Sequence, residues 1–331
     1  MVKITTRFIA AIGFLIISCT SRAQKVEELI TTNEVTRVLT ILASDEMEGR
    51  RTFTPGIDKA AAFIAEEFQK IGLQPIDSTG SYFQKFTLKE IGFARRFGGP
   101  SMGQEDPLMN VVGVIPGKSR ADEFVIFSAH YDHLGIGVPV NEDSIFNGAN
   151  DDASGVTAVI MLAKYFAQKN DNERTLIFAA FTGEEMGGFG SRYFSRQFDS
   201  SKVMAMFNIE MIGTDSKWGK NSAFITGYER SDMGKILEKN LEGSDFSFYP
   251  DPYPQQQLFF RSDNATLARQ GVPAHTISTS KMDAEPYYHT VDDEIETLDL
   301  ENMTRIIHAI AISSRTIISG EDTPSRILSI E

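Results

Sequence analysis

The fold is decided by the apolar run Glu123–Asp132 (EFVIFSAHYD), which ends in a histidine and an aspartate. Two later runs have the same form, Thr175–Glu185 (TLIFAAFTGEE) and Val203–Met211 (VMAMFNIEM). Short apolar runs rich in aromatic and β-branched residues are typical of buried strands. Each run reaches acidic or imidazole side chains near its end. If the three strands are parallel, these side chains gather at one edge of the sheet, where ligands of such folds bind.

Segments with helical periodicity alternate with the strands. The expected helices are Val26–Ala43, Pro55–Ile71, Gly155–Gln168, Gly188–Phe198, Ser231–Leu241, Ser262–Gln270 and Leu300–Ile318. Further strands are expected at Asn110–Ile115, Ala223–Thr226 and Pro273–Ile277, and the Gly-rich stretch Phe93–Pro107 is expected to be a loop near a site entrance. This alternation predicts an α/β fold, a three-layer sandwich with a mostly parallel central sheet and helices on both faces.

The composition excludes several classes of protein. Among 331 residues there are 32 Lys plus Arg and 45 Asp plus Glu, a formal net charge of −13. This acidic balance argues against nucleic acid as a partner, because phosphate binding needs a basic face. The single cysteine excludes a disulfide scaffold, a zinc ribbon and an iron–sulfur cluster. Any bound metal must therefore be held by His, Asp and Glu.

The first 23 residues are expected to be a signal peptide. Lys3 and Arg7 precede the apolar run Phe8–Ile17, which is too short to span a bilayer. Small residues at Ser21 and Ala23 favour cleavage before Gln24. No later segment is apolar over the ~20 residues of a membrane span.

A second interpretation of the leader stays open. The stretch 16–19 (IISC) resembles a bacterial lipobox, in which the lipoprotein signal ends before Cys19 and Cys19 carries the lipid anchor. The plain alternative is an ordinary signal peptide with an incidental cysteine. Both lead us to expect an exported protein that is periplasmic, outer-membrane-anchored or secreted. Residues 24–331 are then expected to form one domain, which opens with a helical segment at 25–75.

Acids and imidazoles follow the expected strands, and each has a plain alternative. A histidine after a strand is more often structural, an Asp pair before a helix is usually an N-cap, and a Glu pair is usually solvated. Glu210 is harder to dismiss, because it interrupts an apolar strand and a buried carboxylate must be paired or metal-bound. The occurrence of such residues at successive strand ends favours a site.

A pair of zinc ions suits this set of residues. Zinc binds imidazole and carboxylate groups, and two ions about 3.5–4 Å apart need a bridging carboxylate. The five candidate ligands are His130, Asp151, Glu185, Glu210 and His289. Glu184 is the free acid that would take a proton from a bridging water. Asp132, two residues after His130, is placed to orient its imidazole.

Ordered motifs along nearly the whole chain resemble the co-catalytic dizinc aminopeptidases of metallopeptidase family twenty-eight (clan MH), in particular secreted bacterial members. The motifs are SAHYDHLG (128–135), NGANDDASG (147–155), FTGEEMGGFGS (181–191), NIEMIG (208–213), RSDNATLARQGVPA (261–274) and YYHTVDD (287–293). The upstream stretch 42–75 also resembles the segment that precedes the catalytic part in these members. The resemblance implies the zinc-dependent exopeptidase fold, two Zn²⁺ per chain, and peptides or small aminoacyl compounds as substrates.

The resemblance also implies a role for each matching residue. His130 matches the first imidazole ligand and Asp151 the bridging carboxylate. Glu184 matches the general base, and Glu185 a ligand of the ion that His289 also binds. Glu210 falls where the family usually has Asp and would complete the ion held by His130.

The family further implies a cis peptide at Asp151–Asp152, with Asp152 and Ser154 shaping the bridging loop. Tyr287 or Tyr288 would help to stabilise the oxyanion. Asn264 stands where many members carry His, which affects the substrate pocket. His133 is expected to be structural.

The leading hypothesis is a metallo-aminopeptidase that hydrolyses N-terminal peptide bonds. One alternative is a glutaminyl cyclase-like enzyme of the same clan with a single zinc, which metal stoichiometry would distinguish. Another is a non-catalytic binding protein with a degenerate peptidase fold. Such proteins lose ligands, whereas every ligand position here holds a competent residue.

Overall fold

The computed structural model describes residues 25–76, 79–92 and 106–327. The expected signal peptide with Cys19, and nearly all of the expected loop Phe93–Pro107, lie outside the described residues. Within the described part of the chain, no helix is both long and apolar enough to cross a membrane.

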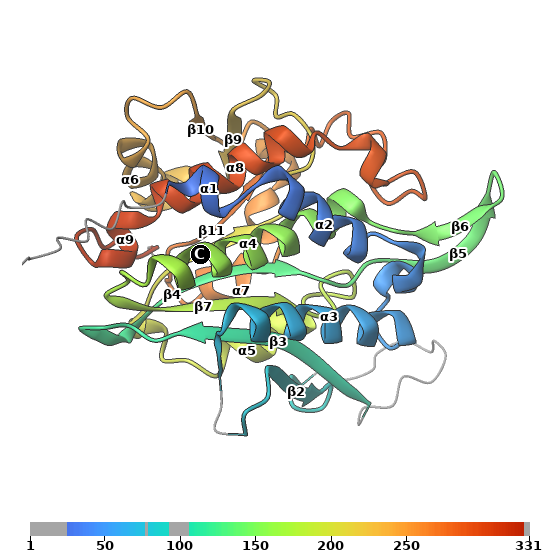
Figure 1. The fold of residues 1–331 in the computed structure, drawn as a ribbon, viewed down its shortest axis with the longest axis horizontal. Helices are drawn as coiled ribbons and strands as arrows, with labels where there is room; N and C mark the ends of the chain where they lie inside the picture. Colours follow the sequence, from blue (N-terminus) through green and yellow to red (C-terminus); the bar gives the residue numbers. More distant parts are fainter. Residues whose placement is uncertain (1–24, 77–78, 93–105, 328–331) are drawn as a thin grey trace, which may run out of the picture.

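A nine-stranded mixed sheet forms the middle layer of the molecule (Figure 1). Its order is β1-β3-β7-β4-β8-β11-β9-β10, with β2 paired to β3. The central strands β7, β4, β8 and β11 are parallel, whereas β3 and β9 run antiparallel to their neighbours β7 and β11. The bounds are β1 (Gln74–Pro75), β2 (Phe83–Thr87), β3 (Pro107–Ile115), β4 (Arg120–His130), β7 (Arg174–Phe181), β8 (Val203–Ile209), β9 (Ser222–Ile225), β10 (Ser247–Pro250) and β11 (Ala274–Ser278).

Helices cover both faces of the sheet (Figure 1). One face carries α2 (Thr32–Leu42), α3 (Pro55–Ile71), α4 (Gly155–Lys169) and α8 (Leu300–Ser313), and α1 (Val26–Leu29), α6 (Met233–Asn240) and α9 (Arg315–Ser319) pack on α8. The other face carries α5 (Phe189–Ser195) and α7 (Asn264–Ala268). The short helical turns are η1 (Asp45–Arg50), η2 (Ala149–Ser154), η3 (Ser200–Lys202), η4 (Tyr228–Arg230), η5 (Pro254–Gln256), η6 (Leu258–Phe260) and η7 (Ile295–Thr297).

Alternate residues of the central strands divide the core into two layers. In β4, Phe127 packs into the cluster under α3 and α4, while its neighbour Ile126 packs into the cluster under α5 and α7. In β7, Phe178 and Ile177 divide in the same way. Both faces of these strands are thus buried, which explains their continuous apolar sequences. The predicted α/β three-layer sandwich is confirmed, with antiparallel pairs only beyond the central strands of the described sheet.

Local signals determine where several helices begin and end. α3 matches its predicted bounds, because Pro55 occupies its first turn and Gly72 ends it in the left-handed conformation, with φ of 87°. The helix expected at Val26–Ala43 is instead two helices, since the Thr31 side chain caps α2 by accepting a hydrogen bond from the Glu34 N–H at 3.3 Å. The expected helix Leu300–Ile318 is likewise divided at Ser314 into α8 and α9.

A hairpin that the sequence did not predict follows β4. It consists of β5 (Gly135–Val140) and β6 (Asp143–Phe146), which pair with each other outside the main sheet and extend from one end of the molecule (Figure 1). Ile136 and Val138 on its first strand are exposed. Ile136, Val138 and Val140 do alternate along this strand, but Gly137 and Pro139 between them disfavour a strand prediction.

We predict that His275, buried in β11, makes stability depend on pH. Its Nδ1–H donates to the Thr226 carbonyl at 2.8 Å, and its Nε2 accepts from the Ser231 hydroxyl at 2.7 Å. Burial lowers its pKa to about 4. The unfolded chain therefore binds this proton more readily than the folded chain does. The contribution of neutral His275 to the free energy of unfolding is complete above pH ~6.5. It is lost as the pH drops towards 4, by up to about 3 kcal/mol.

The measurement is urea unfolding of the wild type and His275→Gln at several values of pH between 4 and 7.5. The wild type should lose more stability than the variant as the pH falls through this range. Parallel loss in both proteins would contradict the prediction.

Candidate metal centre

The site lies beyond the carboxyl ends of the parallel strands. His130 is the last residue of β4, Glu184 and Glu185 follow β7, and Glu210 directly follows β8. Asp151 lies in η2, the turn that leads into α4, and His289 comes from the segment between β11 and η7. The five expected ligands thus come from five separate stretches of chain that the topology brings to one edge of the sheet.

The Asp151 carboxylate lies between two imidazoles. Its Oδ1 is 3.1 Å from Nε2 of His130, and its Oδ2 is 3.3 Å from Nε2 of His289. Each carboxylate oxygen therefore faces a different ring nitrogen, which is the geometry expected of a bridging carboxylate. Asp151 and His130 are buried, whereas the side chain of His289 is 34% exposed.

Glu185 approaches His289 on one side of this arrangement. Its Oε1 is 3.2 Å from Nε2 of His289, as close as the contact between His289 and Asp151. Close ion-pair contacts with Asp151 and Glu185 raise the pKa of the His289 imidazole to about 10. Asp151, Glu185 and His289 therefore surround one point, as the three ligands of a single cation would.

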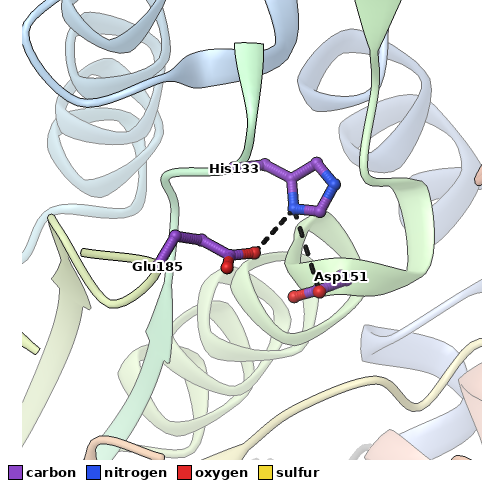
Figure 2. Close-up of side chains that lie close together, drawn as sticks. All are labelled: His133, Asp151 and Glu185. Carbon is purple, nitrogen blue, oxygen red and sulfur yellow. Dashed lines mark hydrogen bonds and ion pairs between the residues drawn. The ribbon is translucent and has the colours of Figure 1, made fainter. Parts of the chain in front are cut away.

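His133, for which a structural role is expected, also lies in the cluster. Figure 2 shows its ring between the two carboxylates, with Nδ1 3.0 Å from Oε1 of Glu185 and 3.8 Å from Oδ2 of Asp151. Among the described residues, His133, Asp151 and Glu185 form a group whose ligand atoms all lie within 4.8 Å of one another. The sequence signal was its position three residues after His130, but the direction of its ring depends on the turn after β4.

Glu210 and Glu184 are acids of the same pocket as Asp151. Burial raises the pKa of Glu210 to about 7. Burial also raises the pKa of Glu184 well above its ordinary value, and the neighbouring charge of Glu210 adds to that shift while His130 opposes it. Glu210 forms no ion pair with His130 within 4.0 Å among the described residues, although Oε2 of Glu210 and Nε2 of His130 are both buried.

Asp132 lies beside the His130 imidazole, as expected, and also binds the turn that carries the two glutamates. Its carboxylate accepts hydrogen bonds from the backbone N–H groups of Glu184 at 3.0 Å and Glu185 at 3.3 Å. The Nδ1 of His130 lies 3.1 Å from the backbone carbonyl oxygen of Asp132, and 3.7 Å from its carboxylate. The backbone of Asp132 thus orients His130, while its side chain holds the turn that carries both glutamates.

Buried polar side chains shape the loop that carries Asp151. The peptide Asp151–Asp152 is cis, as the family resemblance implied. Asp152 accepts from the N–H groups of Gly155 at 3.0 Å and Met211 at 3.1 Å. Ser154 donates to the Asn150 carbonyl at 2.7 Å. Both residues therefore shape this loop, as expected.

Asp293 supports the same loop and was missed by sequence reasoning. It accepts from the N–H groups of Asn150 at 2.8 Å and of Asp151 at 3.0 Å. Its only sequence signal is the acidic turn that follows His289. Because a turn of this kind is usually solvated, a structural role for Asp293 is visible only once the chain has folded.

The pocket beside these acids has an apolar wall. Met211, Phe224, Leu258 and Met282 line it, together with the ring of Tyr288. Tyr288 stacks on His289 with 3.9 Å between ring centroids, and burial raises its pKa. Tyr287 lies outside this pocket, with 36% exposure.

Asn264 does not line this pocket but forms hydrogen bonds with residues close to it. The amide Nδ2 donates to the carbonyl groups of Phe259 at 3.0 Å and Ala274 at 3.2 Å, and Oδ1 accepts from the Thr276 hydroxyl at 2.9 Å. Thr276 itself lines the pocket. Asn264 is therefore connected to the pocket through Thr276.

The unpaired atoms of the site fit a divalent cation. Nε2 of His130, Nε2 of His289 and Oε2 of Glu210 are buried polar atoms that make no well-oriented hydrogen bond to any described residue. Buried polar atoms of this kind are costly unless they have a partner. Imidazole nitrogen and carboxylate oxygen are the ligand atoms that zinc takes. His130, Asp151, Glu185, Glu210 and His289 together supply such a donor set.

Comparison with known proteins identifies the family. Residues 110–313, more than half of the chain, match the model of Peptidase family M28, and the chain belongs to this family. A probable leucine aminopeptidase of Trichophyton verrucosum (strain HKI 0517) is 29% identical over 204 residues, which are 59% of this chain and 53% of the relative. The chain thus spans about half the length of such curated relatives.

Solved structures share the fold at low sequence identity. BSAP, a zinc aminopeptidase from Bacillus subtilis, superposes with a TM-score of 0.66 at 16% identity, over 88% of this chain and 95% of its own. The glutaminyl cyclase of Bacteroides thetaiotaomicron does so with a TM-score of 0.63 at 15% identity, over 88% and 99%. The same fold therefore occurs in a peptidase and in a cyclase, and the fold by itself does not choose between the two reactions.

We predict that zinc stabilises the folded chain through Asp151. At a free zinc concentration 100 times the dissociation constant, a single site adds about 2.7 kcal/mol to the free energy of unfolding. Zinc added to the metal-free protein should therefore raise Tm by several degrees, and Asp151→Asn should lose most of this rise. The measurement is thermal unfolding with zinc and with a chelator.

His308→Gln is the matched control. His308 bonds to the Ile30 carbonyl from α8, away from the cluster, so its variant should keep the full rise in Tm. An Asp151→Asn protein that is stabilised by zinc as strongly as the wild type would contradict the assignment.

Proposed function

We propose that the chain is a zinc metallo-aminopeptidase, which hydrolyses the N-terminal peptide bond of peptides or small aminoacyl substrates. In this proposal His130, Asp151, Glu185, Glu210 and His289 hold two zinc ions. The observation that carries the proposal is the position of Glu184. Its carboxylate lines the pocket beside Asp151 and Glu210, and its backbone N–H is bound by Asp132. Membership of Peptidase family M28 supports the same reaction class.

Glu184 has the properties of a general base in this site. When bound, zinc would supply Lewis-acid charge at this site and so make a water molecule there more acidic. The buried carboxylate of Glu184 has a raised pKa and so can hold a proton taken from the attacking water. The same carboxyl group then gives that proton to the leaving amine. Asp132 fixes the backbone from which Glu184 projects, and so maintains its direction.

The rest of the pocket suits the end of a peptide. Glu184, an acid of the pocket besides the proposed ligands, favours a substrate with a free α-amine. The apolar wall formed by Met211 and Phe224 would receive the first side chain. Because burial raises the pKa of Tyr288, its hydroxyl stays protonated and can donate to the carbonyl oxygen as negative charge develops there.

We predict that Glu184→Gln abolishes most of the activity while leaving the metal in place. Loss of a general base lowers kcat by about 10²- to 10⁴-fold, whereas the amide keeps the size of the side chain. The measurements are hydrolysis of aminoacyl p-nitroanilides with zinc present and the zinc content of each protein. Glu66→Gln on the exposed face of α3 is the control and should keep full activity.

Each other outcome points to a different conclusion. Full activity of Glu184→Gln would show that Glu184 is not the general base. Activity that survives chelation would show that the reaction does not need the metal. One zinc per chain with conversion of N-terminal Gln to pyroglutamate, and no peptide hydrolysis, would indicate a cyclase. Tight peptide binding without turnover would indicate a binding protein.

A further inference from the structure

We propose that Arg50 is a positioning residue of the metal centre, whose guanidinium ties the loop after β4 to the loop that carries Asp151. The proposal rests on the cation-binding part of the proposed function. Arg50 belongs to the N-terminal segment, upstream of residues 110–313 that match the family. It would make that segment a structural component of the metal centre, in addition to a cover for the sheet.

The Arg50 side chain is fully buried, and its partners among the described residues are backbone carbonyl groups. Its Nε donates to the carbonyl of Tyr131 at 2.9 Å, and its Nη2 to the carbonyl of Gly148 at 2.9 Å. Its Nη1 donates to Asn147 and to Leu42, both at 2.6 Å. Tyr131 adjoins the expected ligand His130, and Gly148 lies three residues before Asp151. One planar group therefore spans the two loops whose separation sets the distance between His130 and Asp151.

The backbone of Arg50 contributes to the same connection. The N–H of His133 donates to the Arg50 carbonyl at 3.3 Å. Next to it, Gly49 packs so closely on the hairpin that a Cβ atom would lie 2.6 Å from the carbonyl oxygens of both Gly135 and Phe146. Glu48, Gly49 and Arg50 all have positive φ, between 50° and 62°. Two non-glycine residues in this conformation are unusual, and the surrounding contacts must hold them there.

Two neighbouring side chains of the segment bind the same two loops. The Thr52 hydroxyl donates to Oδ2 of Asp132 at 3.2 Å, and Asp132 holds the Glu184–Glu185 turn. Asp45 accepts from Nδ2 of Asn147 at 2.7 Å. Three side chains of this segment, those of Asp45, Arg50 and Thr52, therefore bind the two loops that carry residues of the site. None of them lines the pocket beside Glu184, so their contribution is to position other groups.

The chemistry of the contact requires arginine. A guanidinium offers five N–H donors in a rigid plane, whereas a lysine ammonium offers three donors on one atom and cannot reach four separated carbonyls. Burial of a charge is costly, and burial lowers the pKa of Arg50, although the carboxylates of Asp293 and Asp151 oppose that shift. The negative charge of the centre thus stabilises the same arginine that holds its loops.

The chain offers a matched control in Arg174. It is also almost fully buried, and its Nη1 donates to the carbonyls of Ile317 at 2.7 Å and Asp322 at 2.9 Å. Arg174 begins β7, at the opposite end of that strand from Glu184. Replacement of either arginine removes a buried guanidinium from carbonyl partners, but only Arg50 touches the loops of the site.

The experiment compares Arg50→Lys with Arg174→Lys by titration of the metal-free proteins with Zn²⁺ and with Co²⁺. Calorimetry gives affinity and stoichiometry, and the Co²⁺ absorption bands report the geometry of the ligands. Both variants should lower Tm. Arg50→Lys should weaken binding of at least one ion by about 10- to 100-fold, the usual effect of changes just outside a ligand set, and alter the Co²⁺ bands. Arg174→Lys should stay within about twofold of the wild type.

If a folded Arg50→Lys protein binds the metal with wild-type affinity and gives wild-type Co²⁺ absorption bands, the proposal is overturned. Arg50 would then contribute to stability alone. If Arg50→Lys does not fold, the double variant Asp45→Ala with Thr52→Val decides, because it removes the other two side-chain contacts of the segment with the same two loops. Weakened metal binding in it supports the proposal, and unchanged binding overturns it. No substrate enters these titrations, so a chain without aminopeptidase activity would refute the proposed function while this result still stood.

Discussion

The carboxylate of Asp151, buried between the imidazoles of His130 and His289, is the group on which the rest of the site depends. A buried negative charge needs hydrogen bonds or a cation close to it. Asp293 binds the backbone N–H of Asp151 at 3.0 Å, and the next residue, Asp152, binds the start of α4. The chain therefore holds this carboxylate by its backbone and leaves both of its oxygens directed at imidazole nitrogens.

The carboxylates of the centre fall into two classes, those that hold the loops and those that line the pocket. Asp132, Asp152 and Asp293 accept hydrogen bonds from backbone N–H groups of the loops that follow the strands. Loops at strand ends expose such N–H groups, and a buried loop must find acceptors for them. The other acids, such as Glu184 and Glu210, project into the pocket, where burial raises their pKa values. The acids of the first class hold the loops from which the pocket acids project, and so determine where those pocket acids lie.

Sequence reasoning succeeded where local signals decide a structure. The bounds of α3 follow from Pro55 and Gly72, and the buried strands follow from unbroken apolar runs whose two faces are both covered. It was less accurate where a cap inside a periodic segment divides that segment, as Thr31 does between α1 and α2. It missed the hairpin β5–β6, because Gly137 and Pro139 interrupt the alternating apolar residues of its first strand and disfavour a strand prediction.

The sequence by itself determined which chemical groups stand at the ends of the parallel strands, since an apolar run of fixed length delivers the residue that follows it to the sheet edge. His130, Glu184 and Glu210 were placed in this way. Only the tertiary structure decided that His133 turns towards Glu185 and that Asp293 and Arg50 support the loops from distant segments. The direction of a side chain beyond a strand depends on backbone angles and on neighbours remote in sequence, which residue type alone does not encode.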